Sequence, residues 1–173
     1  EIQSPTTAGN SFVVTSFGGT GILPYSRLRT NPNWLFHAQF QLNVTNAGSV
    51  FRVGLMDSGY QALATANAPS NCIWLRWDKR TSDGEFFSFE LRRDAVVETN
   101  ASTVKVAMGS WYSVTIYSTN SATVLCQVNN ETPVTMTNIS DVSMCLTANA
   151  EGSVTASRLW IDRISFMASS MSR

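Results

Sequence analysis

Between Trp34 and Thr45 the sequence alternates so that every second side chain is apolar. The apolar positions are Trp34, Phe36, Ala38, Phe40, Leu42 and Val44, and they are interleaved with Leu35, His37, Gln39, Gln41, Asn43 and Thr45. A period of two is typical of a β-strand with one buried face, because successive side chains point to opposite sides. The pattern recurs as far as Leu159–Met167, and no long segment with helical spacing of apolar residues separates the repeats. The residues therefore predict an all-β fold, and they point to no chemistry on their own.

The chain is large enough to bury one sizeable core. It has 173 residues, of which 43% are hydrophobic, and it includes five Trp and nine Phe. A chain of this length and composition is expected to form one ordered domain. We expect a single β-sandwich over residues 1–173, with residues 1–20 as an N-terminal arm or edge strand.

The charge composition argues against two classes of partner. Charged residues make up 14% of the chain and the formal net charge is zero, so no positive field gathers phosphates. General nucleic-acid binding is not expected. No run approaches the roughly 20 apolar residues that a membrane-spanning helix needs, so membrane insertion is not expected either.

The three cysteines, Cys72, Cys126 and Cys145, are odd in number and show no Cys-x-x-Cys spacing. A disulfide framework is therefore not expected. Cys126 and Cys145 would bridge if their strands are neighbours, but we favour buried free thiols, which behave as small hydrophobic groups. A reducing compartment during folding fits this interpretation.

The remaining apolar segments predict about a dozen short strands, each bounded by Gly, Asn or Ser clusters. One helical turn is plausible, within Tyr60–Ser70, which Pro69 interrupts. Many short strands at regular spacing favour an antiparallel sandwich or barrel. The expected strands are Phe12–Val14, Trp34–Thr45, Val50–Met56, Asn71–Lys79, Glu85–Arg93, Ala95–Thr99, Thr103–Ala107, Trp111–Ser118, Thr123–Val128, Val134–Thr137, Val142–Ala148 and Leu159–Phe166.

Candidate catalytic groups are sparse. Glycosidases place two carboxyl groups close together, but alternation sends Glu85 and Glu90 to opposite faces of one strand. His37 is the single histidine and no Gly-x-Ser-x-Gly elbow is present, so an esterase-type triad is not expected. A same-face acid pair from different strands stays open as an alternative, from the set Asp78, Glu85, Glu90 and Asp94.

Metal binding has no characteristic spacing in this sequence. Asp57, Asp78 with Asp83, and Asp162 carry the oxygens that Ca²⁺ prefers, yet no EF-hand or comparable loop is present. Turns that use an Asp side chain account for Asp57 and Asp83 without a metal. We therefore expect no metal and no cofactor.

Trp74, Arg76 and Trp77, beside Lys79 and Arg80, form the densest aromatic and cationic group in the chain. Such side chains stack on sugar rings or anchor protein partners. Alternation places Trp74 and Arg76 on the same face as Asp78. The same face is equally suited to be covered by another strand, with Arg76 paired to Asp78 or Glu90, and we favour this core or intersheet packing.

Three pieces of the sequence carry a resemblance to a known superfamily. They are Trp34–Leu42 with Phe51–Leu55, Gly109–Ile116 with Cys126–Asn129, and Leu159–Phe166. In order, they resemble the early core strands, a Gly-x-Trp strand with its partner, and the closing strand of the concanavalin A-like, laminin-G-like jelly-roll superfamily. With few lysines and a Gly-Gly-Thr-Gly lead-in, the chain is most similar to versions attached to bacteriophage virions. That resemblance implies an antiparallel jelly-roll sandwich with a role in adhesion or particle assembly.

On these grounds we predict a non-enzymatic structural or attachment domain of a virion, as a fibre, spike or capsid decoration. Its partners would be other virion proteins, copies of itself or a host-surface glycan. The predicted contact residues are Trp74, Arg76, Tyr60, Asp57 and Ser58, and removal of Trp74 is expected to weaken binding without unfolding. The alternative is a cellular carbohydrate-binding module or lectin, and a further one is a glycan-cleaving enzyme.

Overall fold

The computed structural model describes residues 2–3, 11–15, 33–43, 48–57, 69–80, 84–94, 96–137, 139, 144–151 and 158–168. Within these ranges the chain forms twelve strands and no helix, so no helix long and apolar enough to cross a membrane occurs there. The strands are β1 (Ile2–Gln3), β2 (Ser11–Thr15), β3 (Trp34–Asn43), β4 (Val50–Asp57), β5 (Cys72–Asp78), β6 (Phe86–Arg93), β7 (Val96–Lys105), β8 (Trp111–Ser118), β9 (Val124–Val128), β10 (Val134–Met136), β11 (Met144–Glu151) and β12 (Arg158–Ala168).

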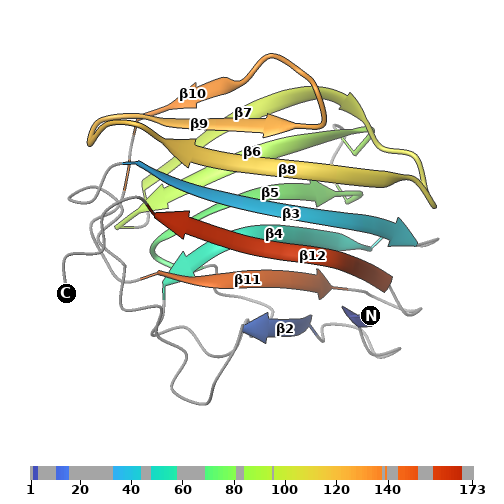
Figure 1. The fold of residues 1–173 in the computed structure, drawn as a ribbon. Coiled ribbons are helices and arrows are strands. Elements are labelled where there is room, and N and C mark those ends of the chain that lie inside the picture. The colour runs from blue at the N-terminus through green and yellow to red at the C-terminus, as the bar shows by residue number, and fades with distance from the viewer. Residues whose placement is uncertain are drawn as a thin grey trace.

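The strands form two antiparallel sheets that face each other (Figure 1). The β3 sheet has the order β1-β12-β3-β8-β9-β10, and the β5 sheet has the order β2-β11-β4-β5-β6-β7. The closing strand β12 pairs with β3, and β11 pairs with β4, so the last two strands of the chain lie inside the two sheets, whereas β1 and β2 stand at the sheet edges. The prediction of an antiparallel jelly-roll sandwich is confirmed.

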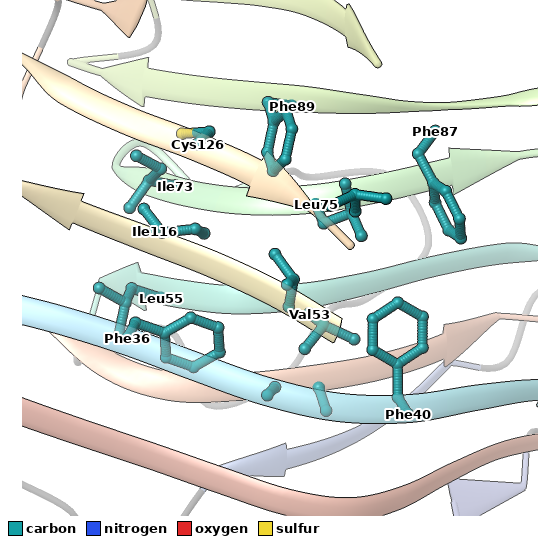
Figure 2. Packing of buried hydrophobic residues seen from close by; sticks show 14 of the residues in the cluster. Phe36, Phe40, Val53, Leu55, Ile73, Leu75, Phe87, Phe89, Ile116 and Cys126 are labelled. Carbon is teal, nitrogen blue, oxygen red and sulfur yellow. The ribbon is translucent and has the colours of Figure 1, made fainter. Parts of the chain in front are cut away.

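The core lies between the two sheets and is formed by the alternating apolar residues. In β3 every second side chain is buried, so the period of two correctly predicted its inner face. Phe40, Phe87 and Tyr112 join the sheets, with ring centroids 4.9 Å apart for Phe87 and Tyr112. Burial of each large side chain of this kind contributes roughly 1.5–3 kcal/mol. Figure 2 shows how residues of both sheets meet, among them Phe36, Val53, Leu55, Ile73, Leu75, Phe89, Ile116 and Cys126.

One predicted boundary is wrong. The two strands expected at Ala95–Thr99 and Thr103–Ala107 are a single strand, β7. Ser88 pairs with Ala101 but Phe86 pairs with Lys105, so β7 holds extra residues opposite β6. Asn100 and Ala101, where a break was expected, pair regularly with Phe89 and Ser88, and the bulge follows them, between Ala101 and Lys105. Local composition does not distinguish such a bulge from a turn.

Two of the three cysteines have described side chains, and both are buried free thiols. Cys126 lies in the core with its Sγ 3.7 Å from Met136 Sδ. Burial raises the pKa of both the Cys72 and Cys126 thiols far above the ordinary range. The favoured prediction of buried free thiols is thus confirmed for the two cysteines whose side chains are described.

Two further predictions fall wholly or partly on residues that the structure does not describe. The helical turn expected within Tyr60–Ser70 lies almost entirely outside the described residues. Of residues 1–20, only β1 and β2 are described, and each stands at the end of its sheet's strand order. The single-domain boundary stays a prediction.

Candidate functional site

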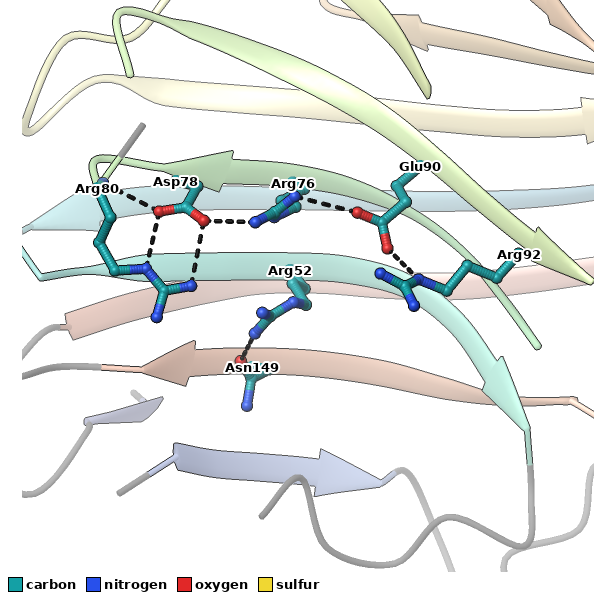
Figure 3. Close-up of polar contacts among 7 residues, drawn as sticks. All are labelled: Arg52, Arg76, Asp78, Arg80, Glu90, Arg92 and Asn149. Atoms are coloured by element: carbon teal, nitrogen blue, oxygen red, sulfur yellow. Dashed lines mark hydrogen bonds and ion pairs between the residues drawn. The ribbon is translucent and has the colours of Figure 1, made fainter. Parts of the chain in front are cut away.

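The outer face of the β5 sheet, opposite the core, carries a group of charged side chains. The register places Arg52 of β4 beside Arg76 of β5, and Trp74 beside Glu90 of β6. We call this surface the arginine face and define it by Trp74 together with the seven polar residues that Figure 3 shows, which are Arg52, Arg76, Asp78, Arg80, Glu90, Arg92 and Asn149. The predicted common face of Trp74, Arg76 and Asp78 is thus formed.

Ion pairs of alternating sign run along the arginine face. Arg76 donates from Nη2 to Asp78 and from Nη1 to Glu90 Oε2, the latter at 3.2 Å. Arg80 donates from Nε to Asp78 Oδ1 at 3.0 Å. At the other end of the row, Arg92 donates from Nε to Glu90 Oε1 at 2.5 Å. Each carboxylate therefore lies between two guanidinium groups.

Both carboxylates are buried, at 8% exposure for Asp78 and 3% for Glu90. Burial acts to raise the pKa of Asp78, but the hydrogen bonds from Arg80 and the charges of Arg76 and Arg80 outweigh it, and the net pKa is lowered. A buried charge is tolerated only when it is paired and hydrogen-bonded. The network consequently fixes the position of Arg76, whose side chain is 26% exposed.

A pocket of about 550 Å³ opens on this face over β5, β6 and β7. Arg76 and Asp78 form part of it, and the ring of Phe86, which is 42% exposed, contributes apolar surface. The pocket lies at the β7 bulge, where the regular pairing of β7 with β6 is interrupted. Its described lining is Arg76, Asp78, Phe86, Phe87, Ser88, Thr99, Ala101, Ser102 and Thr103.

Glu131 holds the bulge from the turn after β9. Its Oε2 accepts hydrogen bonds from Ser102 Oγ at 2.9 Å and from the backbone N–H of Thr103 at 2.8 Å. The Thr103 hydroxyl also donates to Oε2, at 2.9 Å. Sequence reasoning missed Glu131, because no local pattern connects a turn glutamate with a strand 29 residues earlier.

Trp74 is fully buried, with 0% exposure, and packs with Met56 and Cys72. Arg52 lies over the indole, with Cζ 5.5 Å from the ring centroid, and donates to Asn149 Oδ1 at 2.9 Å. The indole Nε1 has no hydrogen-bond partner among the described residues. The ring is therefore covered and offers no surface to a partner.

Gly54 explains how β4 and β5 come so close beside Trp74. A Cβ at position 54 would lie 2.3 Å from the carbonyl oxygen of Ile73 and 2.6 Å from Cα of Trp74. No real Cβ approaches backbone atoms so closely, so only glycine fits there. The position of Trp74 thus depends on its neighbour in the next strand.

The other predicted contact residues are not brought to the pocket by the described structure. Asp57 ends β4, and its backbone N–H donates to the carbonyl of Asn71 at 2.9 Å, while its Oδ2 accepts from Asn71 Nδ2 at 3.4 Å. These contacts join the end of β4 to the start of β5. Ser58 and Tyr60 lie outside the described residues, so their role stays a prediction.

The residues weighed for catalysis and metal binding are dispersed. Asp78 and Glu90 share a face but Arg76 bridges them. Glu85 instead pairs with Lys105 at 2.8 Å. His37 lies in the other sheet, with Nδ1 3.2 Å from Thr115 Oγ1. Among the described residues, no three His, Cys, Asp or Glu side chains are grouped so that they could hold a metal ion.

Comparison with known proteins identifies the fold class. No family model matches the sequence, and neither does any curated protein. In structure the chain is similar to carbohydrate binding module CBM66 from Bacillus subtilis, with a TM-score of 0.55 and 7% identity over 96% of this chain and 86% of that one. It is also similar to Xenopus laevis galectin-Ib, with a TM-score of 0.53 and 10% identity over 91% and 99% of the two chains.

A third similar structure has a TM-score of 0.67 and 9% identity over 96% of this chain and 78% of the other. That structure is described with endo-acting O-glycanases that prominent members of the human gut microbiota express to initiate mucin breakdown. At such identities the likeness establishes the fold, a jelly-roll sandwich of the concanavalin A-like kind, as in carbohydrate-binding modules and galectins.

Proposed function

We propose that this chain is a carbohydrate-binding domain that holds a glycan in the pocket over β5, β6 and β7, and that it is not an enzyme. The observation that supports this most is Arg76, which is partly exposed in the pocket while both of its acidic partners are buried. The guanidinium is thereby held in one orientation before a ligand arrives.

Sugar recognition needs this combination of groups. A sugar ring carries hydroxyls that form hydrogen bonds with donors and acceptors at defined positions. It also has apolar C–H faces that pack on aromatic rings. The pocket supplies a guanidinium from Arg76, hydroxyls from Ser88 and Thr99, and an exposed ring from Phe86. A preorganised site binds more tightly, because less conformational freedom is lost on binding.

The similar structures support the same class of ligand. The named neighbours include a carbohydrate binding module, a galectin and a structure described with O-glycanases. Carbohydrate binding, which the sequence offered as the alternative, is therefore the better supported hypothesis.

The state of Asp78 argues against a role as the general acid of a glycosidase. A glycosidase needs one carboxylic acid that stays protonated near neutral pH. The lowered pKa of Asp78 keeps this carboxylate ionised instead. Mass spectrometry of any bound glycan after prolonged incubation with the protein should show intact glycan, and cleavage products would contradict this part of the proposal.

The direct test is a glycan array with labelled protein, followed by titration calorimetry with a glycan that binds. Phe86→Ala and Arg76→Gln should each weaken binding about tenfold or more, as truncation of a buried interface anchor does. Val96→Ala is the matched control. Val96 is 64% exposed and begins β7, whereas Phe86 pairs with Lys105 at the other end of that strand. Equal affinity of all variants, with folding confirmed by circular dichroism, would overturn the proposed site.

A virion location is a narrower proposal within this function. An attachment domain of a virion would bind host glycans through such a pocket, and it would assemble with other virion proteins or with itself. Light scattering on the purified chain, with and without calcium and chelator, tests this. A calcium-independent oligomer would support the virion hypothesis, and a calcium-sensitive monomer would favour a cellular lectin.

A further inference from the structure

We propose a second binding surface, for a long uncharged polysaccharide, on the outer face of the β3 sheet. This surface lies on the opposite side of the sandwich from the pocket and does not depend on the function proposed above. We call it the tryptophan face and define it by four rows across β12, β3 and β8, in register order. The rows are Trp160–Gln41–Trp111, Arg163–Gln39–Ser113, Ser165–His37–Thr115 and Met167–Leu35–Tyr117.

The first row places two exposed indoles on one side of the sheet. Trp160 of β12 and Trp111 of β8 both pair with Gln41 of β3, so the three side chains point the same way. Their exposures are 37% for Trp160 and 47% for Trp111. The two tryptophans stand on β12 and β8, which lie on either side of β3, so their backbones are about 9.5 Å apart. Gln41 is fixed between them, since its Nε2 donates to the carbonyl of Gly109 at 2.5 Å.

The next two rows offer hydrogen-bonding groups instead of apolar surface. Amide, hydroxyl and imidazole side chains fill them, and His37 lies 3.2 Å from the Thr115 hydroxyl. Arg163 is the one Asp, Glu, Lys or Arg side chain in the four rows, and the exposed Asp162 beside it, at the bulge of β12, carries the opposite charge, so these two charges cancel. A surface with so little charge is complementary to an uncharged ligand and gives no attraction for phosphate or carboxylate polymers.

The fourth row ends at a second hollow. A shallow pocket of about 330 Å³ is lined there by Leu35, Tyr117 and Met167, among other described residues. Along β3 this row is six residue steps from the tryptophan row, a distance of about 20 Å. Aromatic surface thus occurs at both ends of the track, with polar groups between. The length suits a polymer of several sugar units that lies along β3.

The arrangement fits a polysaccharide better than a protein partner. The centre of a protein interface is a contiguous apolar patch with polar groups around it. Here the order is reversed, because the exposed apolar side chains stand at the ends and the polar rows lie in the centre. A glycan chain presents C–H faces and hydroxyls repeatedly along its length, so it can use both.

The test is co-sedimentation with insoluble cellulose, chitin and β-mannan as probes, with the amount of bound protein measured at several protein concentrations. We expect the chain to bind at least one of these polymers, and the double variant Trp111→Ala with Trp160→Ala to lose about tenfold or more of its affinity. Each single variant should lose part of it. Folding is checked by thermal unfolding, where exposed tryptophans should matter little.

Controls separate the two faces. Val96→Ala, on β7 of the other sheet, should bind polymer as the parent does. If Phe86→Ala abolishes polymer binding while the tryptophan variants retain it, the polymer occupies the pocket and the proposal is overturned. It is equally overturned if none of the polymers binds, or if light scattering shows a dimer that the double variant converts to monomer, since the face is then a contact between copies.

Discussion

The two outer faces of the sandwich present tryptophan in opposite ways. On the arginine face, Trp74 is fully buried under Arg52, and the accessible groups are those of an ion-pair network. On the tryptophan face, Trp111 is 47% exposed and stands in rows that are almost free of charge. Burial alternates along β8, which carries Trp111, whereas nearly every residue of β5, which carries Trp74, is buried. The difference teaches that alternation tells which face a side chain joins, and not whether that face is open.

The contrast also separates two physical routes to recognition. The arginine face fixes donors and acceptors in advance at the cost of burying charge, which is stable only while every partner is present. The tryptophan face leaves apolar rings in water and gains when a ligand covers them. The first should therefore be sensitive to mutation through stability, and the second through binding alone.

The sharpest test of this comparison is to remove a tryptophan from each face. Trp74→Ala should lower the free energy of unfolding by about 3–5 kcal/mol, because a large buried side chain leaves a cavity. Trp111→Ala should change it by no more than about 0.5 kcal/mol. Urea denaturation followed by circular dichroism measures both. This reverses the sequence-based expectation that Trp74 can be removed without loss of folding, and equal effects would break the comparison.

Removal of one buried carboxylate tests the ion network. Glu90→Ala leaves Arg76 and Arg92 facing each other without their shared partner, so it should cost about 3–5 kcal/mol. Glu85→Ala is the matched control in the same hairpin, where a pair with Lys105 is 64% exposed on both sides. Exposed pairs contribute about 0–1 kcal/mol. Similar unfolding midpoints for the two variants would show that the network contributes little.

Gly54→Ala sharpens the reason for the burial of Trp74. The new Cβ would meet backbone atoms of β5 at 2.3 Å and 2.6 Å, so the two strands must shift apart. Forcing atoms into a packed region costs about 1–3 kcal/mol. Near-ultraviolet circular dichroism should report a changed tryptophan environment together with the lost stability. An unchanged spectrum and stability would mean that the strands are not so close.

Much of this fold follows from the sequence, and the pocket does not. The inner faces were predictable because burial in an antiparallel sandwich follows a period of two, and Arg76 with Asp78 is a local, same-face pair. The pocket depends on the bulge in β7, which Glu131 holds from a distant turn. The row of Trp160, Gln41 and Trp111 depends on β3 pairing with strands far along the chain. The pocket and the tryptophan row therefore both depend on strand register, and the residues of one strand alone do not determine how it pairs with distant strands.

The pH dependence of stability should reveal Asp78. Its pKa is lower in the folded protein than the ordinary value of about 3.9 in an unfolded chain. The folded state therefore favours the ionised form, and this contribution is present above about pH 4 and is lost as the pH falls through the folded pKa. Urea midpoints between pH 7 and pH 2 should fall more steeply for the parent than for Asp78→Asn. Parallel curves would contradict the assignment.

The smallest expected effect comes from Thr147, beside Gly54 on the arginine face. Its hydroxyl is buried without a hydrogen-bond partner among the described residues, whereas Asn149, two positions on, accepts from Arg52. A buried hydroxyl without a partner is destabilising, so Thr147→Val should leave stability unchanged or raise it by up to about 1 kcal/mol. Asn149→Ala, which removes a bonded partner, should instead lower it by about 1–3 kcal/mol. Urea denaturation measures both changes. If Thr147→Val lost as much stability as Asn149→Ala, the prediction would be wrong. The arginine face would then rely on hydrogen bonding at every position, and not on the arginine and carboxylate pairs alone.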